Sequence, residues 1–99
     1  MTNHLLLPEA DQDMTDIVLY TKEKWGREQV YKYVSELEAC FSDIASGHVV
    51  VCEFEGFAGV YSVLCNEHYV FYMKDDPVLI IGIIHTSRDI MRHLKGRTK

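Results

Sequence analysis

The hydrophobic period of the chain changes close to residue 47, and this change strongly restricts the folds open to it. Before that point, apolar side chains recur every three or four residues, which is typical of amphipathic helices. After it the period becomes two, and valines and aromatic residues dominate, as in strands. We therefore expect an α+β protein in which helices from the first half cover a sheet built mainly by the second half.

Two helices are predicted in the first half. One spans residues 8–25, with Pro8 in its first turn, where a missing N–H costs nothing, and with Gly26 at its end. The second carries a cleaner apolar stripe from Val30 to Ile44 and ends at Ser46-Gly47. Because only a turn at Gly26 separates them, the helices should form an antiparallel hairpin.

The strands are predicted from short apolar or alternating runs separated by turns. The run over residues 78–84 is apolar at nearly every position, which indicates a strand covered on both faces or central in the sheet. The expected fold is a short N-terminal strand, a helical hairpin on a mostly antiparallel sheet, and a short C-terminal helix with a basic tail. The predicted strands are residues 4–7, 49–54, 60–65, 68–73 and 78–84.

Length and composition limit the organisation further. A chain of 99 residues that is 47% hydrophobic can bury one core, so residues 1–99 should form a single domain. No apolar run is long enough to span a membrane and the start lacks a signal peptide, so we expect a cytoplasmic protein without membrane contact. Cys40, Cys52 and Cys65 show no metal-site spacing, and we expect reduced, mostly buried thiols, no metal and no cofactor.

Charge is distributed unevenly along the chain. Residues 1–55 hold eleven acids and four bases, whereas residues 56–99 hold four acids and six bases. From Arg88 onward, five bases stand against one acid, Asp89. The overall charge of −5 disfavours direct binding to nucleic acid, because such binding needs cations that neutralise phosphate. The basic end instead favours one anionic partner.

The segment His85-Thr86-Ser87-Arg88-Asp89 could suggest a catalytic cluster. A serine directly before a helix is more often its N-cap, however, and Asp89 would then lie in the first turn, near the positive end of the helix dipole. His85 at a strand end is expected to be a hydrogen-bonded structural residue. We therefore predict Ser87 and Asp89 as structural caps and assign no catalytic residue.

The aromatic residues of the hairpin fall into two groups. Trp25 and Tyr33 lie on the apolar stripes and are expected in the core. Tyr20 and Tyr31 lie off the stripes, so they are better candidates for contact with a partner protein.

Residues 20–47, YTKEKWGREQVYKYVSELEACFSDIASG, resemble the helical hairpin of the ParE toxins, a branch of the RelE/ParE superfamily. That hairpin carries Tyr-Thr, Trp-Gly, a Gln-aliphatic pair, Leu-Glu and an aliphatic-Ala-x-Gly end. The later segments CNEHYVFYM and IIGIIHTSRDIMRHL resemble the family's His-Tyr-aliphatic-Phe strand and its final aliphatic run into His, Arg, Asp and His-Leu. The resemblance extends over nearly the whole chain and is closest to the plasmid-stabilisation branch.

The resemblance implies the toxin of a type II toxin–antitoxin pair, which inhibits DNA gyrase and is neutralised by a cognate ParD-like antitoxin in a hetero-oligomer. Such a toxin acts by binding and is not itself an enzyme. The candidate gyrase contacts are basic residues of the C-terminal end: Arg88, Arg92, Lys95 and Arg97. The candidate antitoxin contacts are aromatic: Tyr20, Trp25, Tyr31 and Tyr61.

Two alternatives remain open. A RelE-type ribosome-dependent mRNA endonuclease would need a general base, a general acid and cations for phosphate on the sheet. The predicted strands offer Tyr61, Tyr69, Tyr72, Lys74 and His68, while Glu53, Glu55 and Glu67 nearby would repel phosphate. A decayed toxin that only binds antitoxin is the other alternative, because no arginine stands between Arg27 and Arg88.

Overall fold

The computed structural model describes residues 4–47, 52–53 and 58–94. In this part of the chain, a short strand is followed by two long helices, four strands and a short helix, in the order predicted. The elements are β1 (His4–Leu6), α1 (Pro8–Trp25), α2 (Arg27–Ser46), β2 (Cys52–Glu53), β3 (Val60–Cys65), β4 (His68–Met73), β5 (Val78–His85) and α3 (Ile90–Leu94).

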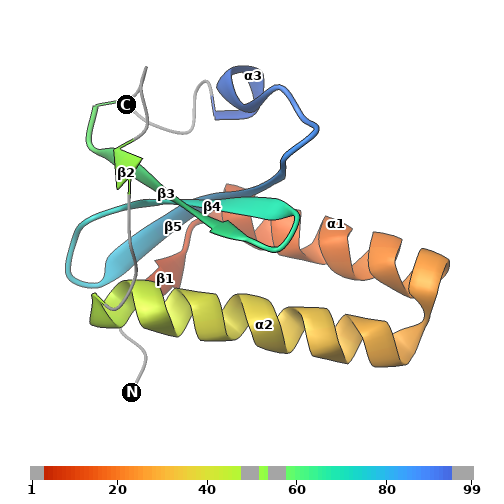
Figure 1. Ribbon diagram of the computed structural model, residues 1–99. Helices are drawn as coiled ribbons and strands as arrows, with labels where there is room; N and C mark the ends of the chain where they lie inside the picture. The colour runs from red at the N-terminus through yellow and green to blue at the C-terminus, as the bar shows by residue number, and fades with distance from the viewer. Residues whose placement is uncertain (1–3, 48–51, 54–57, 95–99) are drawn as a thin grey trace.

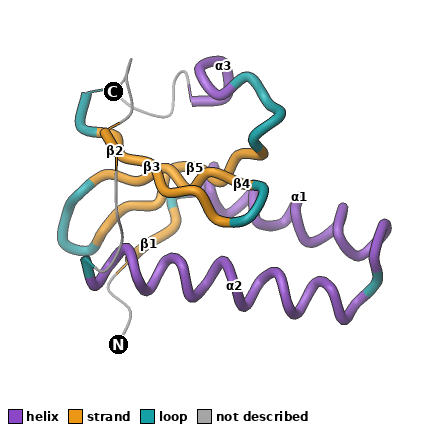
Figure 2. The backbone as a smooth tube through the Cα atoms, in the orientation of Figure 1, coloured by secondary structure: helices purple, strands orange, loops and turns teal. Residues whose placement is uncertain are grey.

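The described strands form one sheet with the order β1-β5-β4-β3-β2. The β1–β5 pair is parallel and the other three pairs are antiparallel. The α1–α2 hairpin covers one face of the sheet, and α3 lies on the other (Figure 1). The tube view shows the same layers, with two long helices beneath the strands (Figure 2). The predicted α+β class and the mostly antiparallel sheet are confirmed, and a parallel edge strand is added.

The hairpin is tight because one residue, Gly26, joins its helices. Gly26 has φ +89°, a region in which a side chain would be strained, and its N–H donates to the Lys22 carbonyl at 3.0 Å. Gly47 ends α2 in the left-handed conformation with φ +76°. The predicted helix over residues 8–25 is therefore confirmed at both ends, and the second helix ends at the predicted Ser46-Gly47.

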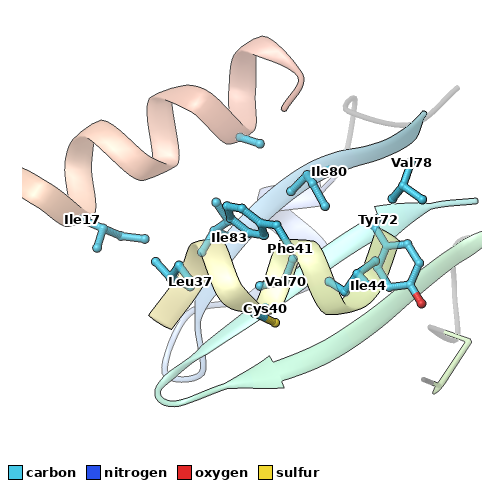
Figure 3. Packing of buried hydrophobic residues seen from close by; sticks show 11 residues of the cluster. Ile17, Leu37, Cys40, Phe41, Ile44, Val70, Tyr72, Val78, Ile80 and Ile83 are labelled. Atoms are coloured by element: carbon cyan, nitrogen blue, oxygen red, sulfur yellow. The ribbon is translucent and has the colours of Figure 1, made fainter. Parts of the chain in front are cut away.

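Each face of the sheet carries its own hydrophobic cluster. On the hairpin face, residues from both helices pack on β4 and β5, as Figure 3 shows. On the opposite face, Leu94 of α3 closes a smaller cluster. The first cluster comprises Ala10, Ile17, Leu37, Cys40, Phe41, Ile44, Val70, Tyr72, Val78, Ile80 and Ile83. The second comprises Val60, Phe71, Ile81, Ile84 and Leu94.

β5 contributes to both clusters, which explains its almost uninterrupted apolar sequence. It lies inside the sheet, between β1 and β4, which agrees with the predicted interior position. Its pairing with β4 shifts by one residue: Tyr72 faces Ile80, but Phe71 faces Gly82, so Ile81 is an extra residue in the strand. This bulge determines which residues meet at the far end of the two strands.

The predicted capping at α3 needs a correction. The helix begins at Ile90, and Asp89 is its N-cap: the Asp89 carboxylate accepts a hydrogen bond from the Arg92 N–H at 3.3 Å. Ser87 lies too early in the chain for this role, and its hydroxyl contacts His85 Nδ1 at 2.8 Å instead. The prediction of Ser87 as a cap was therefore wrong, whereas Asp89 takes the capping role itself.

Among the described thiols, Cys40 is buried and Cys65 is half-buried, and both are free. Most of the predicted strand over residues 49–54, with the side chain of Cys52, lies outside the described residues, as do Lys95 and Arg97. None of the helices in the described ranges is both long and apolar enough to cross a membrane.

Candidate functional site

A groove lies where the sheet ends and the helical hairpin continues past it. The connected end of the hairpin, around Gly26, projects beyond the strands (Figure 1). Both helices, the start of β4, the end of β5 and the segment after β5 line this groove, whose volume is about 1000 Å³. We call it the hairpin groove. Its lining includes Asp13, Asp16, Tyr20, Trp25, Lys32, Tyr33, Glu36, Asn66, Glu67, His68, His85, Ser87 and Arg88.

Two histidines meet at the floor of the hairpin groove. The β-bulge places His85, at the end of β5, directly opposite His68, at the start of β4. Their rings meet edge to face with centroids 5.1 Å apart. If the register of the Tyr72–Ile80 pair continued without the bulge, His68 would face the apolar side chain of Ile84 instead. The bulge thus creates the polar character of the floor.

His68 is held as a neutral imidazole. Burial, together with the neighbouring His85, lowers the pKa of His68 from 6.5 to about 4, although Glu67 and Asp13 act in the opposite direction. The Tyr33 hydroxyl is hydrogen-bonded to His68 Nδ1. Burial, reinforced by the neighbouring Cys65, raises the pKa of Tyr33 to about 12, so the phenol stays protonated and its O–H donates a hydrogen bond to the imidazole nitrogen.

His85 uses both ring nitrogens. Its Nδ1 accepts from the Ser87 N–H at 3.0 Å, so the proton of the neutral ring belongs on Nε2, which lies 3.2 Å from a Glu67 carboxylate oxygen. The Ser87 hydroxyl lies 2.8 Å from the same Nδ1. His85 thus connects the β3–β4 turn with the segment that follows β5, which agrees with the structural role predicted for it.

Two further contacts fix the walls of the hairpin groove. Asp13 of α1 accepts a hydrogen bond from the Ile83 N–H of β5 at 3.0 Å. Asn66, in the β3–β4 turn, donates to the Glu36 carboxylate of α2 at 2.8 Å. Each helix is therefore attached to the end of the sheet by a side chain that also lines the groove.

The charges lining the hairpin groove are mainly negative. Four carboxylates (Asp13, Asp16, Glu36 and Glu67) stand against two permanent cations, Lys32 and Arg88. Such a lining favours a partner with basic side chains and disfavours phosphate. Within the described ranges, no group of three or more His, Cys, Asp or Glu residues is arranged to hold a metal ion.

The structure brings residues from both predicted contact sets into this groove. Tyr20 and Trp25, predicted antitoxin contacts, line it with exposures of 61% and 71%, and Arg88, a predicted gyrase contact, lines it as well. The expectation that Trp25 lies in the core was wrong, because the sheet does not extend beneath the end of α1. Tyr33 is half-buried and packs against the core, as expected.

The other predicted residues lie apart from the groove lining. Tyr31 is 65% exposed on α2, and Arg92 is exposed on α3. Tyr61 of β3 stacks on Tyr72 with ring centroids 5.8 Å apart, and the Lys74 ammonium lies 4.3 Å from the centroid of the Tyr61 ring. These contacts hold Tyr61 half-buried on the sheet, away from Tyr20 and Trp25.

Sequence reasoning missed the acidic lining and the histidine pair. The carboxylates Asp13, Asp16 and Glu36 look like ordinary solvent-facing helix residues in sequence. His68 and His85 did carry a signal, since each lies at the end of a predicted strand and the two strands are consecutive. If residues are paired one by one from the β4–β5 turn, however, His68 falls opposite Ile84, because this regular pairing omits the bulge.

Comparisons with known proteins agree with one another. The family described as "ParE toxin of type II toxin-antitoxin system, parDE" matches residues 5–90. "Toxin ParE" of Escherichia coli is 33% identical over 102 residues, covering 100% of this chain and 99% of the relative. "Toxin ParE1" of Caulobacter vibrioides is 33% identical over 95 residues, covering 95% of this chain and 99% of the relative.

A solved structure shares the fold. A chain from the "Chromosomal ParDE TA system from P. aeruginosa" superposes with a TM-score of 0.71, covering 86% of this chain and 96% of that chain. Its sequence is 13% identical, so this likeness concerns the fold alone.

Proposed function

The chain belongs to the ParE toxin family of type II toxin–antitoxin systems, and on that premise we propose that it inhibits DNA gyrase and is neutralised by a ParD-like antitoxin. The observation that carries the proposal is the hairpin groove. It combines exposed aromatic side chains, which suit a protein partner, with an acidic lining that disfavours nucleic acid.

In this proposal a segment of the antitoxin enters the hairpin groove. Apolar side chains of the segment pack on Tyr20 and Trp25, and its basic side chains face Asp16 and Glu36. Arg88 borders the same groove, so the bound antitoxin also covers the first residue of the basic end. Arg92 on α3, together with Lys95 and Arg97, then forms the remainder of the gyrase contact.

We further propose that the protein acts by binding and not by catalysis. The two histidines are the groups in the groove that could suggest a ribonuclease, but both nitrogens of His85 already have partners and His68 is neutral near pH 7. The surrounding carboxylates would repel an RNA phosphate. These features support the binding role over general acid–base catalysis.

The test is induced expression in bacteria, with and without the antitoxin, combined with a supercoiling assay on purified gyrase. We expect filamentous cells and inhibited supercoiling. Arg88→Ala combined with Arg92→Ala should weaken inhibition at least tenfold, whereas Lys22→Ala combined with Arg27→Ala removes the same charge elsewhere and should not. Rapid translation arrest with cut mRNA would instead identify an endonuclease. Normal growth with retained antitoxin binding would identify a decayed toxin.

A further inference from the structure

Three successive turns of α2 contact the end of the β3–β4 hairpin. Tyr33 is hydrogen-bonded to His68, and Glu36 accepts from Asn66 at 2.8 Å. One turn further along α2, Cys40 belongs to the buried cluster against which Cys65, the last residue of β3, packs. We call this row of contacts the α2 seam. It is the only place among the described residues where two cysteine side chains meet.

The backbone of α2 shows where the Cys65 sulfur lies relative to Cys40. Cys65 Sγ lies 3.9 Å from the carbonyl oxygen of Glu36. In an α-helix, that carbonyl accepts the N–H of the residue four positions later, which is Cys40. The Cys65 sulfur is therefore beside the turn of α2 that carries Cys40, and Cys65 packs against the buried cluster to which Cys40 belongs. Figure 3 shows Cys40 on the face of α2 that is turned toward the strands.

We propose that Cys40 and Cys65 are an oxidisable dithiol, which closes to a disulfide between α2 and β3 by exchange with a small disulfide such as oxidised glutathione. Cys65 is the entry point because it is half-buried, whereas Cys40 is buried beneath it. This modification site does not depend on the proposed function.

The exchange takes two steps. The Cys65 thiolate attacks one sulfur of oxidised glutathione, forming a mixed disulfide and releasing one glutathione thiolate. Cys40 then loses its proton to water and attacks the Cys65 sulfur, which releases the second glutathione thiolate. The two protons lost by the cysteines end on the two glutathiones. Overall, two protein thiols are oxidised and one small disulfide is reduced to two thiols.

The surroundings of the pair make closure slow at neutral pH. Burial raises the pKa of Cys40 to about 12, and burial also raises the pKa of Cys65. Because the thiolate is the attacking form, the rate should increase roughly tenfold for each pH unit below these pKa values. Closure is therefore expected to be faster in mildly alkaline solution than at neutral pH.

The experiment uses the full chain with Cys52→Ser, so that the third cysteine cannot compete. The protein is treated with oxidised glutathione at about pH 8.5 and then unfolded, and its remaining free thiols are alkylated. Its mass is then measured by mass spectrometry. We expect the protein mass to fall by two hydrogen atoms, with no alkyl group added. The Tm should rise by about 10 °C and return to its starting value when the disulfide is reduced.

The matched control adds Cys40→Ser to the same chain. It should instead retain one glutathionyl group on Cys65, with no comparable rise in Tm. Alkylation of both cysteines after oxidation would overturn the proposal. So would a mixed disulfide that persists while Cys40 is present, or a Tm that falls on closure, because each result means that the native α2 seam cannot accept the bond.

Discussion

The two ends of the helical hairpin differ sharply, although both carry the same kind of apolar stripe. At the sheet end, Leu37, Phe41 and Ile44 of α2 are each less than 5% exposed. At the tip, which joins the helices, the stripe residue Trp25 is 71% exposed. The difference arises because the sheet supports the first end and stops short of the second (Figure 1).

The apolar side chains at the two ends therefore have different roles, one in stability and the other in binding. At the sheet end, removing side chains from water stabilises the folded chain. At the tip, the aromatic side chains stay in water and contribute little to folding, so their apolar area remains for a partner to cover. Variants at the two ends should accordingly divide between loss of stability and loss of binding.

The largest effect is expected at the sheet end. Phe41→Ala removes a ring that is 2% exposed and lies 5.4 Å, centroid to centroid, from the ring of His4. The lost burial and the remaining cavity should lower the free energy of unfolding by about 3–5 kcal/mol, measured by urea denaturation. If the free energy of unfolding falls only as little as expected for truncating an exposed side chain, the hairpin is not anchored at this end.

At the tip, Trp25→Ala should leave stability nearly unchanged and weaken binding. We expect a change in unfolding free energy within about 0.5 kcal/mol, because the side chain is mostly exposed. The affinity for the antitoxin should fall by about 2 kcal/mol, roughly 30-fold, by titration calorimetry. Leu19→Ala is the matched control: Leu19 is 60% exposed on α1 but does not line the groove. Equal losses of affinity would refute a specific role for Trp25.

Between the two ends lies His68, whose protonation should make stability depend on pH. The folded state has a pKa of about 4 for His68, against 6.5 ordinarily, so the unfolded state binds more protons between these values. The contribution of His68 to stability is full above about pH 6.5 and is lost as the pH falls toward 4. We expect a loss of about 1–2 kcal/mol, less than the full linkage value because the ring is partly exposed.

Comparison with His68→Gln isolates this contribution from the titration of other groups. The difference in unfolding free energy between the natural chain and the variant should shrink between pH 7 and about pH 4.5. A difference that stays constant would show that His68 titrates normally in the folded protein.

The smallest effect is expected for Tyr33→Phe, which removes only a hydroxyl from the middle of the hairpin. Loss of the hydrogen bond to His68 should lower the free energy of unfolding by about 1 kcal/mol. Tyr31→Phe, on the exposed side of α2, serves as the control and should have no measurable effect. If both variants are neutral, the hydrogen bond between Tyr33 and His68 does not stabilise the fold.

Local sequence patterns were sufficient to predict most of the fold. The 3.6-residue stripes and Gly26 located both helices, and the alternation after residue 47 located β3 and β4 with their observed bounds. These features depend on neighbours along the chain. The parallel position of β1 beside β5 was not predicted, because it pairs residues more than seventy positions apart.

The candidate site was harder to predict because it depends on where elements end relative to one another. The stripe placed Trp25 in the core, since a stripe cannot reveal how far the sheet extends beneath it. Tyr20 was correctly expected to be exposed, because it lies off the stripe. The meeting of His68 and His85 depends on a single extra residue, Ile81, in an apolar run where every register looks equally acceptable.

The parallel β1–β5 pair also affects the order of events during synthesis. β1 is made before its partners Val78, Leu79 and Ile80, which lie more than seventy residues further along the chain. At about 5–20 residues per second, the ribosome needs several seconds to reach them, and until then the N-terminal strand has no partner in the sheet. The helical hairpin can form earlier from local contacts. The sheet therefore closes only after β5 has been synthesised, which leaves an interval in which a nascent toxin lacks its finished groove.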